Sequence, residues 1–536
     1  MREVAVTAPE SLAPETPKPH RPRAWRPWLL RLALTVASGF VFYLSFAPRP
    51  LWWLAPIGFA GFAYALRGRR LWGGLGYGFA FGVAFNLPLL YWLQDFLGVE
   101  FGPWPWLGLS VALAAYLGVA GALSTVVARL PWGPVWTSMI IIATETPRAW
   151  WPLGGFPWGR VAFSQPDGAF VPLASIGGAP LVGFAVVLTG FAVPPLVSRL
   201  RQRAWRGSIL PAAGVVVPVV AGLALWPTIG IAAETGSLTV ATVQGNAPDV
   251  GIGLMAEQDT LRANHLAQSA QLAQQIHSGA VPQPDLVIWP ESVAEFRGAD
   301  PALDQTVADL GAPTLVGTIF RAGAPGVTQN SEVVWDPRTG PGERYSKQSL
   351  VPFSEYVPAR AIAQWVTPFV NGFYDMTPGT APAVLDVAGT KVATPICYEI
   401  AYDYVTRGGV DQGGRLIVLP TNTAWFGRGG MSYQQLAIAR LRAVEHSRAV
   451  VVSATSGVSA IVAPDGTIMQ STSEFTAASL VGRVPLRDTT TLSDRLGAWT
   501  EYGQVGAAVA AVLAGLVLRV RTRRAGAEHT RATVAG

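Results

Sequence analysis

The stretch V-A-T-P-I-C-Y-E-I at residues 392–400 contains Cys397, the only cysteine in the 536-residue chain. It reads as a short β-branched strand that breaks at Cys397 into a new segment. A junction of this kind lifts a side chain out of a sheet and presents it to a pocket. The stretch therefore makes Cys397 a candidate nucleophile. The alternative is an inert thiol, because free cysteine is often buried as a small apolar residue.

The composition around this stretch is that of a membrane protein. Half of the residues are hydrophobic and only 13% are charged, with twenty tryptophans and fifty-eight glycines. A single cysteine permits no intramolecular disulfide, and the five histidines lack metal-ligand spacing, so we expect neither a metal nor another cofactor. The arginines lie beside apolar runs rather than on a basic face with aromatic residues, so we expect no nucleic-acid partner.

Eight apolar runs predict eight membrane spans, although the second run is short for a helix that needs about 20 residues to cross a bilayer. The first run lacks a cleavage pattern and is interpreted as an uncleaved anchor. The runs cover residues 29–47, 51–66, 72–93, 104–128, 134–152, 169–198, 208–231 and 503–518. The predicted organisation begins with a basic cytoplasmic tail at 1–28 and a seven-helix domain at 29–231. A catalytic domain at 236–488, an eighth helix at 503–518 and a second cytoplasmic tail at 519–536 follow.

The arginines predict the orientation of these spans, because positive charge accumulates on the cytoplasmic side. With the N-terminal tail inside, the clusters at 67–70, 199–206 and 519–524 all fall on the cytoplasmic side. Arg49 in the first outer loop is the exception, while the second outer loop, 94–103, carries two acids and no cation. The catalytic domain with Cys397 is therefore predicted to be extracytoplasmic.

The segment 236–488 has the pattern of a single α/β domain. Its apolar blocks shorten to strand length and alternate with polar helices and turns. About 250 residues are enough for one such domain with a good core. Expected strands are 238–243, 286–289, 314–319, 392–396, 416–419 and 449–454, and expected helices are 254–277 and 433–448. We interpret His265 and His446, which fall on these helices, as structural residues.

Three stretches in this domain carry polar residues that strands and helices do not require. The first is W-P-E at 289–291, where Glu291 follows a strand, and the second is K-Q-S-L-V-P-F-S-E at 347–355. The third is C-Y-E at 397–399. Taken singly, such a glutamate is usually a cap and such a lysine usually faces solvent. Taken together, in this order, they resemble the carbon-nitrogen hydrolase (nitrilase) superfamily with its Glu-Lys-Cys triad, as do residues 442–448 and 454–459.

This resemblance spans the whole 236–488 segment and implies an α-β-β-α sandwich. The position of the domain between a seventh and an eighth span narrows the resemblance to the apolipoprotein N-acyltransferase family, over nearly the full chain. The implied catalytic residues are Glu291 as general base, Lys347 as oxyanion stabiliser and Cys397 as nucleophile. By the same resemblance, Glu355 is expected to orient the site, and Tyr398 and Glu399 to shape the pocket.

The resemblance also implies a two-step reaction in a bacterial cytoplasmic membrane. Cys397 would take an acyl chain from a phospholipid as a thioester, and the N-terminal amine of a diacylglyceryl-cysteine apolipoprotein would then receive it. The thioester must be kept from water. We expect a monomer.

Several apolar segments have two interpretations. The runs 361–374, with Trp365, and 425–430, with Trp425 and Phe426, are either core or a mobile lid. The loop 152–160 is either an interfacial aromatic belt or the lining of a lipid site. Glu145 is either functional or paired locally with Arg148.

Two other functions compete with acyl transfer. One is a membrane-tethered amidase or nitrile hydrolase that uses the same triad with water as the acceptor, which eight spans disfavour because one helix would suffice as an anchor. The other is a transporter with a degenerate nitrilase-like domain. The intact Glu291, Lys347 and Cys397 and the scarcity of paired intramembrane charges disfavour it.

Overall fold

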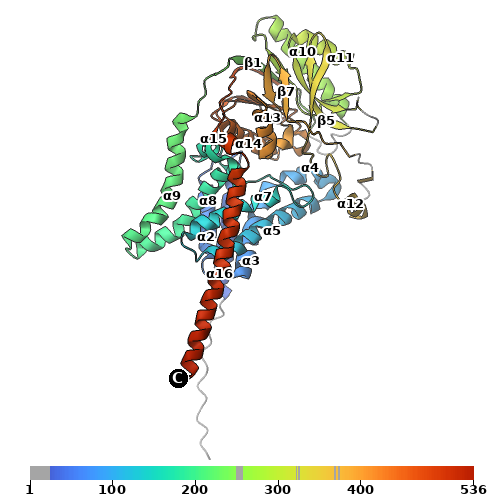
Figure 1. The fold of residues 1–536 in the computed structure, drawn as a ribbon. Coiled ribbons are helices and arrows are strands. Elements are labelled where there is room, and N and C mark those ends of the chain that lie inside the picture. Colours follow the sequence, from blue (N-terminus) through green and yellow to red (C-terminus); the bar gives the residue numbers. More distant parts are fainter. Residues whose placement is uncertain are drawn as a thin grey trace, which may run out of the picture.

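The structure is a computed structural model that describes residues 25–248, 257–321, 323, 326–366, 370–371 and 375–535. A helical region forms one half, and an α/β domain packs on one end of it (Figure 1). The connection from α9 (Trp205–Leu225) climbs along the side of the molecule to β1 (Ser237–Gln244), and α16 (Trp499–Ala535) returns along the helical region. The predicted N-terminal tail lies almost wholly outside the described residues, as does part of the run 361–374.

A helix overlaps each of the eight apolar runs. These helices are α1 Trp25–Leu44, α2 Leu54–Leu66, α3 Leu71–Leu89, α5 Trp104–Val127, α6 Gly133–Ala143, α8 Ala174–Arg201, α9 Trp205–Leu225 and α16 Trp499–Ala535. Among the described residues, four helical segments are long and apolar enough to cross a membrane, namely Trp104–Val127, Val171–Arg201, Trp205–Thr228 and Trp499–Thr522. A fifth qualifies if α3 and the helix after it form one bent span. The membrane-type helical region is confirmed, and the number of eight spans stays a prediction.

Two segments differ from the expectations. The second outer loop, expected at 94–103, forms the helix α4, Trp92–Phe101, which is bent by 63° from α3. The fifth run is helical only to Ala143 in α6 and continues as the four-residue α7, Glu145–Arg148. Pro147, Pro152 and the glycines after it cannot extend a regular helix, so the chain leaves the bundle here. It crosses to the α/β domain through the 3-10 turns η1, Val161–Ser164, and η2, Val171–Leu173.

The bundle packs through small residues, as membrane helices often do. A Cβ at Gly78 of α3 would lie 2.2 Å from the carbonyl oxygen of Leu117 in α5, so glycine is required for this close approach. Beside this contact, phenylalanine rings from α1, α2 and α3 form a buried aromatic core of Phe42, Phe59, Phe62, Phe81 and Phe85.

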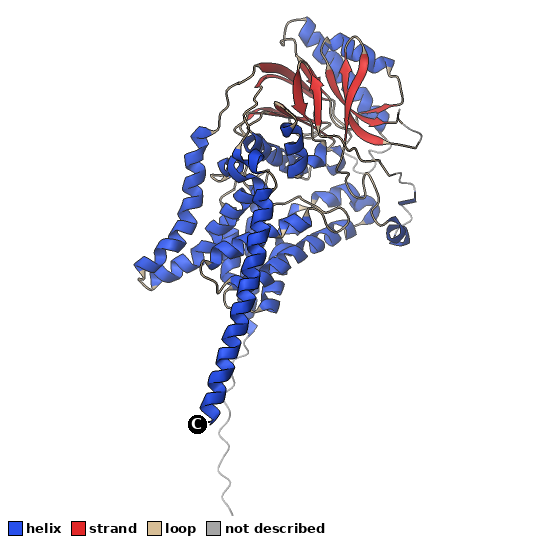
Figure 2. Cartoon of the chain, in the orientation of Figure 1, coloured by secondary structure: helices blue, strands red, loops and turns tan. Residues whose placement is uncertain are grey.

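The α/β domain contains two sheets (Figure 2). The first, in the order β13-β1-β2-β4-β5-β6 with β3 beside β4, consists of Ala478–Pro485, Ser237–Gln244, Leu286–Ile288, Thr314–Phe320, Gln329–Asp336, Gly340–Ser346 and Ala294–Phe296. The second, β12-β11-β10-β9-β8-β7, consists of Ile468–Ser471, Ala460–Val462, Val450–Ala454, Leu416–Thr421, Thr390–Ala393 and Val384–Val387. Pro395 explains why β8 ends before the expected residue 396, since proline cannot donate to the ladder.

The sheets face each other and carry helices on their outer faces. The Thr242 hydroxyl of β1 donates to the Ser453 hydroxyl of β10 across the interface at 2.7 Å. The first sheet carries α10 Gln258–His277 and α11 Pro301–Leu310, and the second carries α13 Asp403–Asp411 and α14 Met431–His446. The α-β-β-α sandwich is therefore confirmed. Since α14 also packs on α8, the second sheet and its helices face the membrane-type bundle.

Candidate active site

Cys397 opens the 3-10 turn η6, Cys397–Ala401, four residues after β8 ends. Its backbone φ is 51°, a left-handed value that a non-glycine residue adopts only where the surrounding structure holds it, and such residues cluster at active sites. The neighbouring strands β8 and β9 are parallel, and β1, β2 and β4 are parallel in the other sheet. The carboxyl ends of β2, β8 and β9 therefore supply the site, where α/β folds place their ligands.

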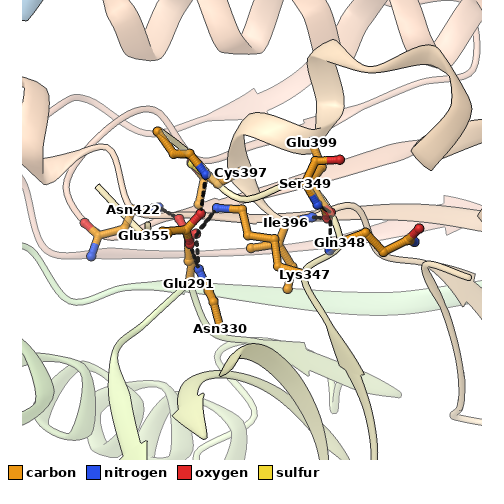
Figure 3. Close-up of polar contacts among 12 residues, drawn as sticks. Glu291, Asn330, Lys347, Gln348, Ser349, Glu355, Ile396, Cys397, Glu399 and Asn422 are labelled. Atoms are coloured by element: carbon orange, nitrogen blue, oxygen red, sulfur yellow. Dashed lines mark hydrogen bonds and ion pairs between the residues drawn. The ribbon is translucent and has the colours of Figure 1, made fainter. Parts of the chain in front are cut away.

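The structure brings the predicted triad together at the interface of the two sheets (Figure 3). The Nζ of Lys347 lies 2.8 Å from Oε1 of Glu291 and 3.0 Å from Oε1 of Glu355. All three side chains are buried, and the predicted orienting residue Glu355 thus shares the lysine with Glu291. The other carboxylate oxygen of Glu355, Oε2, accepts a hydrogen bond from the backbone N–H of Val351 at 2.7 Å. This bond fixes the loop that follows Lys347.

Two asparagines that the sequence analysis did not single out complete the carboxylate site. The Nδ2 of Asn330 lies 2.7 Å from Oε1 of Glu291 and 2.6 Å from Oε1 of Glu355. The backbone N–H of Asn422 donates to Oε2 of Glu291 at 2.9 Å. These donors hold the carboxylate of Glu291 in one orientation. The sequence around Asn330, near the start of β5, does not indicate a site residue, because its partners Glu291 and Glu355 are distant in the chain.

The thiol has partners of its own from the second sheet. The Thr421 hydroxyl lies 3.1 Å from Sγ of Cys397, and Nε2 of Gln435 lies 3.7 Å from the same sulfur. Thr421 is the last residue of β9, and Gln435 lies on α14. Both groups can donate a hydrogen bond to sulfur, and the sequence analysis identified neither.

The charges in the site set the resting protonation of its three groups. Burial, and then the charge of Glu291, raise the pKa of the Cys397 thiol to about 12, against the lowering effect of Lys347 and Thr421. Burial by itself would raise the pKa of Glu291, but the Lys347 ammonium and Asn330 bring it below its usual value. The two carboxylates likewise raise the pKa of Lys347 despite its burial. The resting site therefore holds a neutral thiol beside an ionised carboxylate that can accept its proton.

Glu399 lies two residues after Cys397 and ties down the turn that Cys397 begins. Its Oε2 accepts from the backbone N–H of Ile396 at 2.9 Å, and its Oε1 accepts from those of Gln348 at 2.7 Å and Ser349 at 2.9 Å. The Tyr345 hydroxyl donates to the same carboxylate. Glu399 therefore joins the turn that begins with Cys397 to the segment that carries Lys347.

Tyr398 faces the helical region. Its ring stacks on Trp158, with centroids 6.2 Å apart and an interplanar angle of 11°, and lies 5.9 Å from Phe156. Trp158 also donates to Gln434 of α14 at 2.7 Å. The loop 152–160 is thus packed against the residue next to Cys397, which favours its interpretation as a lining of the candidate site over that of a belt alone.

The two predicted apolar segments are placed differently. Phe426, in the 3-10 turn η7, Ala424–Phe426, packs edge-on against Trp92 of α4 at 4.9 Å, and Trp425 packs on Phe96 at 6.0 Å. Trp365, on the seven-residue α12, Arg360–Val366, is 88% exposed at the periphery of the domain (Figure 1). The structure therefore brings η7, but not Trp365, to the contact between the two regions.

The two histidines have structural contacts. Nδ1 of His265 lies 2.7 Å from the carbonyl oxygen of Leu261, and Nδ1 of His446 lies 2.6 Å from Oδ1 of Asp494. Within the described parts of the chain, no group of three or more His, Cys, Asp or Glu residues is arranged to hold a metal ion.

Comparison with known proteins matches both halves of the chain. Residues 38–192 match the model of the apolipoprotein N-acyltransferase N-terminal domain, and residues 239–493 match that of the carbon-nitrogen hydrolases. An apolipoprotein N-acyltransferase of Mycolicibacterium smegmatis is 35% identical over 511 residues, which cover 91% of this chain and 85% of the relative. One from Azotobacter vinelandii is 30% identical, over 92% of this chain and 96% of the relative.

Among solved structures, an amidase from Nesterenkonia sp. is 16% identical, covers 50% of this chain and 95% of its own, and has a TM-score of 0.33. The relatives from M. smegmatis and A. vinelandii, in contrast, extend over both the helical region and the α/β domain. With these matches over nearly its full length, the chain belongs to the apolipoprotein N-acyltransferase family.

Proposed function

We propose that this protein transfers an acyl chain from a phospholipid to the N-terminal amine of a diacylglyceryl-cysteine apolipoprotein, through a thioester on Cys397. The observation that carries the proposal is the buried cluster of Cys397, Glu291 and Lys347 in a chain of this family. The relatives named apolipoprotein N-acyltransferase support the reaction and its lipoprotein acceptor. They also support a bacterial membrane location.

In the first step, Sγ of Cys397 attacks the ester carbonyl of the phospholipid while Glu291 takes the thiol proton. The ester C–O bond then breaks, and Glu291 returns the proton to the departing alkoxide of the lysophospholipid. The Lys347 ammonium, which lies beside Glu291, stabilises the oxyanion of the tetrahedral intermediate. Because the pKa of the thiol is high, this proton transfer has to accompany the attack.

In the second step, the free amine of the acceptor attacks the thioester carbonyl. The C–S bond breaks, Glu291 accepts a proton from the amine, and the proton passes to the Cys397 thiolate. The enzyme returns to its starting state, and the net change is the movement of one acyl group from an ester to an amide. Between the steps, the burial of Cys397, which is 6% exposed, protects the thioester from water.

The site needs access to two substrates anchored in a membrane. We propose eight spans, in the domain order given by the apolar runs. The α/β domain then lies outside the cytoplasm, because this orientation places the arginine clusters together on the cytoplasmic side. The exposed side chains of Trp365 and Ile362 on α12, 88% and 67% exposed, suit an arm at the lipid interface. The protein acts as a monomer in this proposal, since one chain supplies the whole triad.

The test is to incubate the purified protein with phosphatidylethanolamine that carries a labelled acyl chain, and to examine Cys397 by mass spectrometry. We expect a hydroxylamine-sensitive acyl adduct on Cys397 that disappears when a diacylglyceryl peptide with a free N-terminus is added. The Cys397→Ser variant should give no N-acylated peptide. The proposal fails if no adduct forms, if Cys397→Ser still acylates the peptide, or if the label is released only as free fatty acid in the presence of the peptide.

A further inference from the structure

A row of buried charges connects the helical region to the nucleophile turn. On the helical side, Nε of Arg160 lies 3.3 Å from Oε2 of Glu145, and the backbone N–H of Val161 donates to Oε1 of Glu145 at 2.8 Å. On the other side, Nη1 of Arg160 lies 2.8 Å from Oδ2 of Asp403, the first residue of α13. Arg148, the expected partner of Glu145, is more distant at 3.9 Å.

The row continues from Asp403 to the segment that begins with Cys397. Arg442 of α14, which is fully buried, forms an ion pair through Nη2 with Asp403. The same guanidinium donates from Nε to the carbonyl oxygen of Ile400 at 3.0 Å and from Nη2 to that of Ala401 at 3.2 Å. Ile400 and Ala401 are the last two residues of η6. Arg442 therefore holds the end of the turn whose first residue is the nucleophile.

The far end of the row returns to the membrane-type bundle. Nη1 of Arg442 forms an ion pair with Glu445, and a Cβ at Gly178 in the break of α8 would lie 2.6 Å from Oε1 of Glu445. Only a glycine with its φ of 64° lets α8 approach this carboxylate so closely. The row of alternating charges thus begins at Glu145 of the helical region, contacts the end of η6 through Arg442, and ends at Glu445 beside Gly178 of α8.

We propose that Arg160 is a positioning residue for the nucleophile, which acts through Asp403 and Arg442 to hold η6 and Cys397 in register with Glu291 and Lys347. Nothing in the family comparison assigns such a role to Arg160. A link of this kind ties the geometry of the thiol to the docking of the α/β domain on the helical region. Because Trp158, two residues before Arg160, stacks on Tyr398, the same segment reaches the nucleophile from a second side.

The electrostatic energy of these buried charges favours one specific arrangement of the two regions over nonspecific contact between them. A buried charge is tolerated only when it is paired, and the removal of one partner leaves the other uncompensated. Burial would raise the pKa of Asp403, but Arg160 and Arg442 hold it below its usual range, so Asp403 is a carboxylate. Without Arg160, Asp403 would depend on Arg442 alone, and the guanidinium would be drawn away from the carbonyl oxygen of Ala401. The end of η6 would then lose a donor.

The chain offers a matched control for this role. Arg440, also on α14, forms an ion pair with Asp167 of the helical region, with Nη2 2.7 Å from Oδ1. This contact joins the same two regions, but Arg440 otherwise donates to the carbonyl oxygen of Gly466, away from η6. Arg440→Gln should therefore weaken docking without disturbing Cys397.

The experiment measures the rate at which chloroacetamide alkylates Cys397, the sole cysteine, by intact-protein mass spectrometry of the full chain in detergent. We expect Arg160→Gln to slow alkylation roughly 3- to 30-fold, the range of effects transmitted through packed networks. Arg160→Lys, which keeps the charge, should recover part of the rate. Arg440→Gln should alkylate at the wild-type rate, and melting temperatures are recorded for every variant.

The decisive variant is the double substitution Arg160→Gln with Asp403→Asn. It removes the uncompensated carboxylate, so Arg442 stays on η6 and the double variant should react faster than Arg160→Gln alone. The proposal is overturned if Arg160→Gln lowers the melting temperature as Arg440→Gln does while Cys397 reacts at the wild-type rate, or if the double variant is the slower one. If Arg160→Gln does not fold, the comparison of Arg160→Lys with Arg440→Gln decides in the same way.

The role of Arg160 in catalysis rests on the proposed acyl transfer, but alkylation does not. Failure of the wild-type protein to form an acyl adduct would reject the proposed function and leave the alkylation result valid. Unchanged alkylation in Arg160→Gln, with a normal acyl adduct in the wild type, would reject the positioning role alone.

Discussion

The Nζ of Lys347 lies 2.8 Å from Oε1 of Glu291, and both side chains are almost completely buried. The same ammonium lies 3.0 Å from Glu355, so one cation serves two carboxylates. Such a group cannot be removed without leaving buried negative charge unpaired. The structure of the site therefore depends on one lysine, to which we also assign a catalytic role.

The first prediction concerns this dependence. Lys347→Met should lower the rate of Cys397 acylation by about 10² to 10³, because one oxyanion donor is lost. It should also destabilise the domain, by about 3 to 5 kcal/mol if both carboxylates stay ionised. Single-turnover acylation and thermal unfolding measure the two effects. Retention of activity in Lys347→Met would contradict the assigned role.

Asn330 supplies the second prediction, because its Nδ2 touches Glu291 and Glu355 at 2.7 Å and 2.6 Å. Asn330→Asp preserves the shape but replaces this donor with a third carboxylate beside a single lysine. We expect acylation by Asn330→Asp to fall more than by Asn330→Ala near neutral pH and to recover partly in acid, where the added acid is protonated. Equal activities of the two variants at all pH values would show that the charge around Glu291 is unimportant.

The third prediction is the pH dependence of thiol reactivity. Since burial and Glu291 raise the pKa of Cys397 to about 12, the thiolate fraction grows throughout the accessible range. Chloroacetamide alkylation should rise about tenfold per pH unit from about pH 7 to about pH 10, without the plateau near pH 8.5 of an ordinary cysteine. A cysteine peptide under the same conditions provides the control. A plateau in the protein below about pH 9 would contradict the raised pKa.

Glu332 of β5 supplies the fourth prediction. It is fully buried, and within the described residues neither carboxylate oxygen has a hydrogen-bond partner. Burial first, and the charge of Glu291 next, raise its pKa well above the ordinary value. A folded-state pKa above the unfolded one, which is about 4.3, contributes stability that is fully present below the unfolded pKa and is lost as the pH rises from there through the folded-state pKa.

Glu332→Gln, which cannot ionise, should therefore melt at a higher temperature than the wild type at about pH 8 and at a similar temperature at about pH 4. Glu332→Ala should be destabilised at both pH values, because it leaves a cavity. A lower melting temperature for Glu332→Gln at about pH 8 would mean that the ionised form has a partner. Thermal unfolding in detergent at the two pH values gives the answer.

The fifth prediction concerns orientation. In a Cys397→Ser background, a cysteine at exposed Gln275 of α10 should react with a membrane-impermeant maleimide in intact cells. A cysteine at exposed Arg203, between α8 and α9, should react only after the cytoplasmic side is opened. The reverse pattern would overturn the orientation inferred from the arginines.

Much of the architecture could be read from the sequence because the relevant signals are local. An apolar run predicts a helix whatever it packs against, and a helix overlaps each of the eight runs. The strand end at Glu291 and the break at Cys397 are likewise local features. Both residues could therefore be chosen as candidates before their contacts were known. The helix α4 was missed because its polar residues Asp95 and Glu100 resembled those of a loop.

What only the tertiary structure decided are the contacts between residues far apart in the chain. Asn330, Thr421 and Gln435 become site residues because the sheets bring them to Glu291 and Cys397. The sequence shows Glu145 as an unusual acidic residue in an apolar segment. Its main partner in the structure is Arg160, because the chain folds back after α7. The sequence by itself determined the kinds of element and the choice of Cys397 as the candidate nucleophile, since these depend on neighbouring residues. The charge pairing around Cys397 depends on packing across the two regions, which local patterns do not specify.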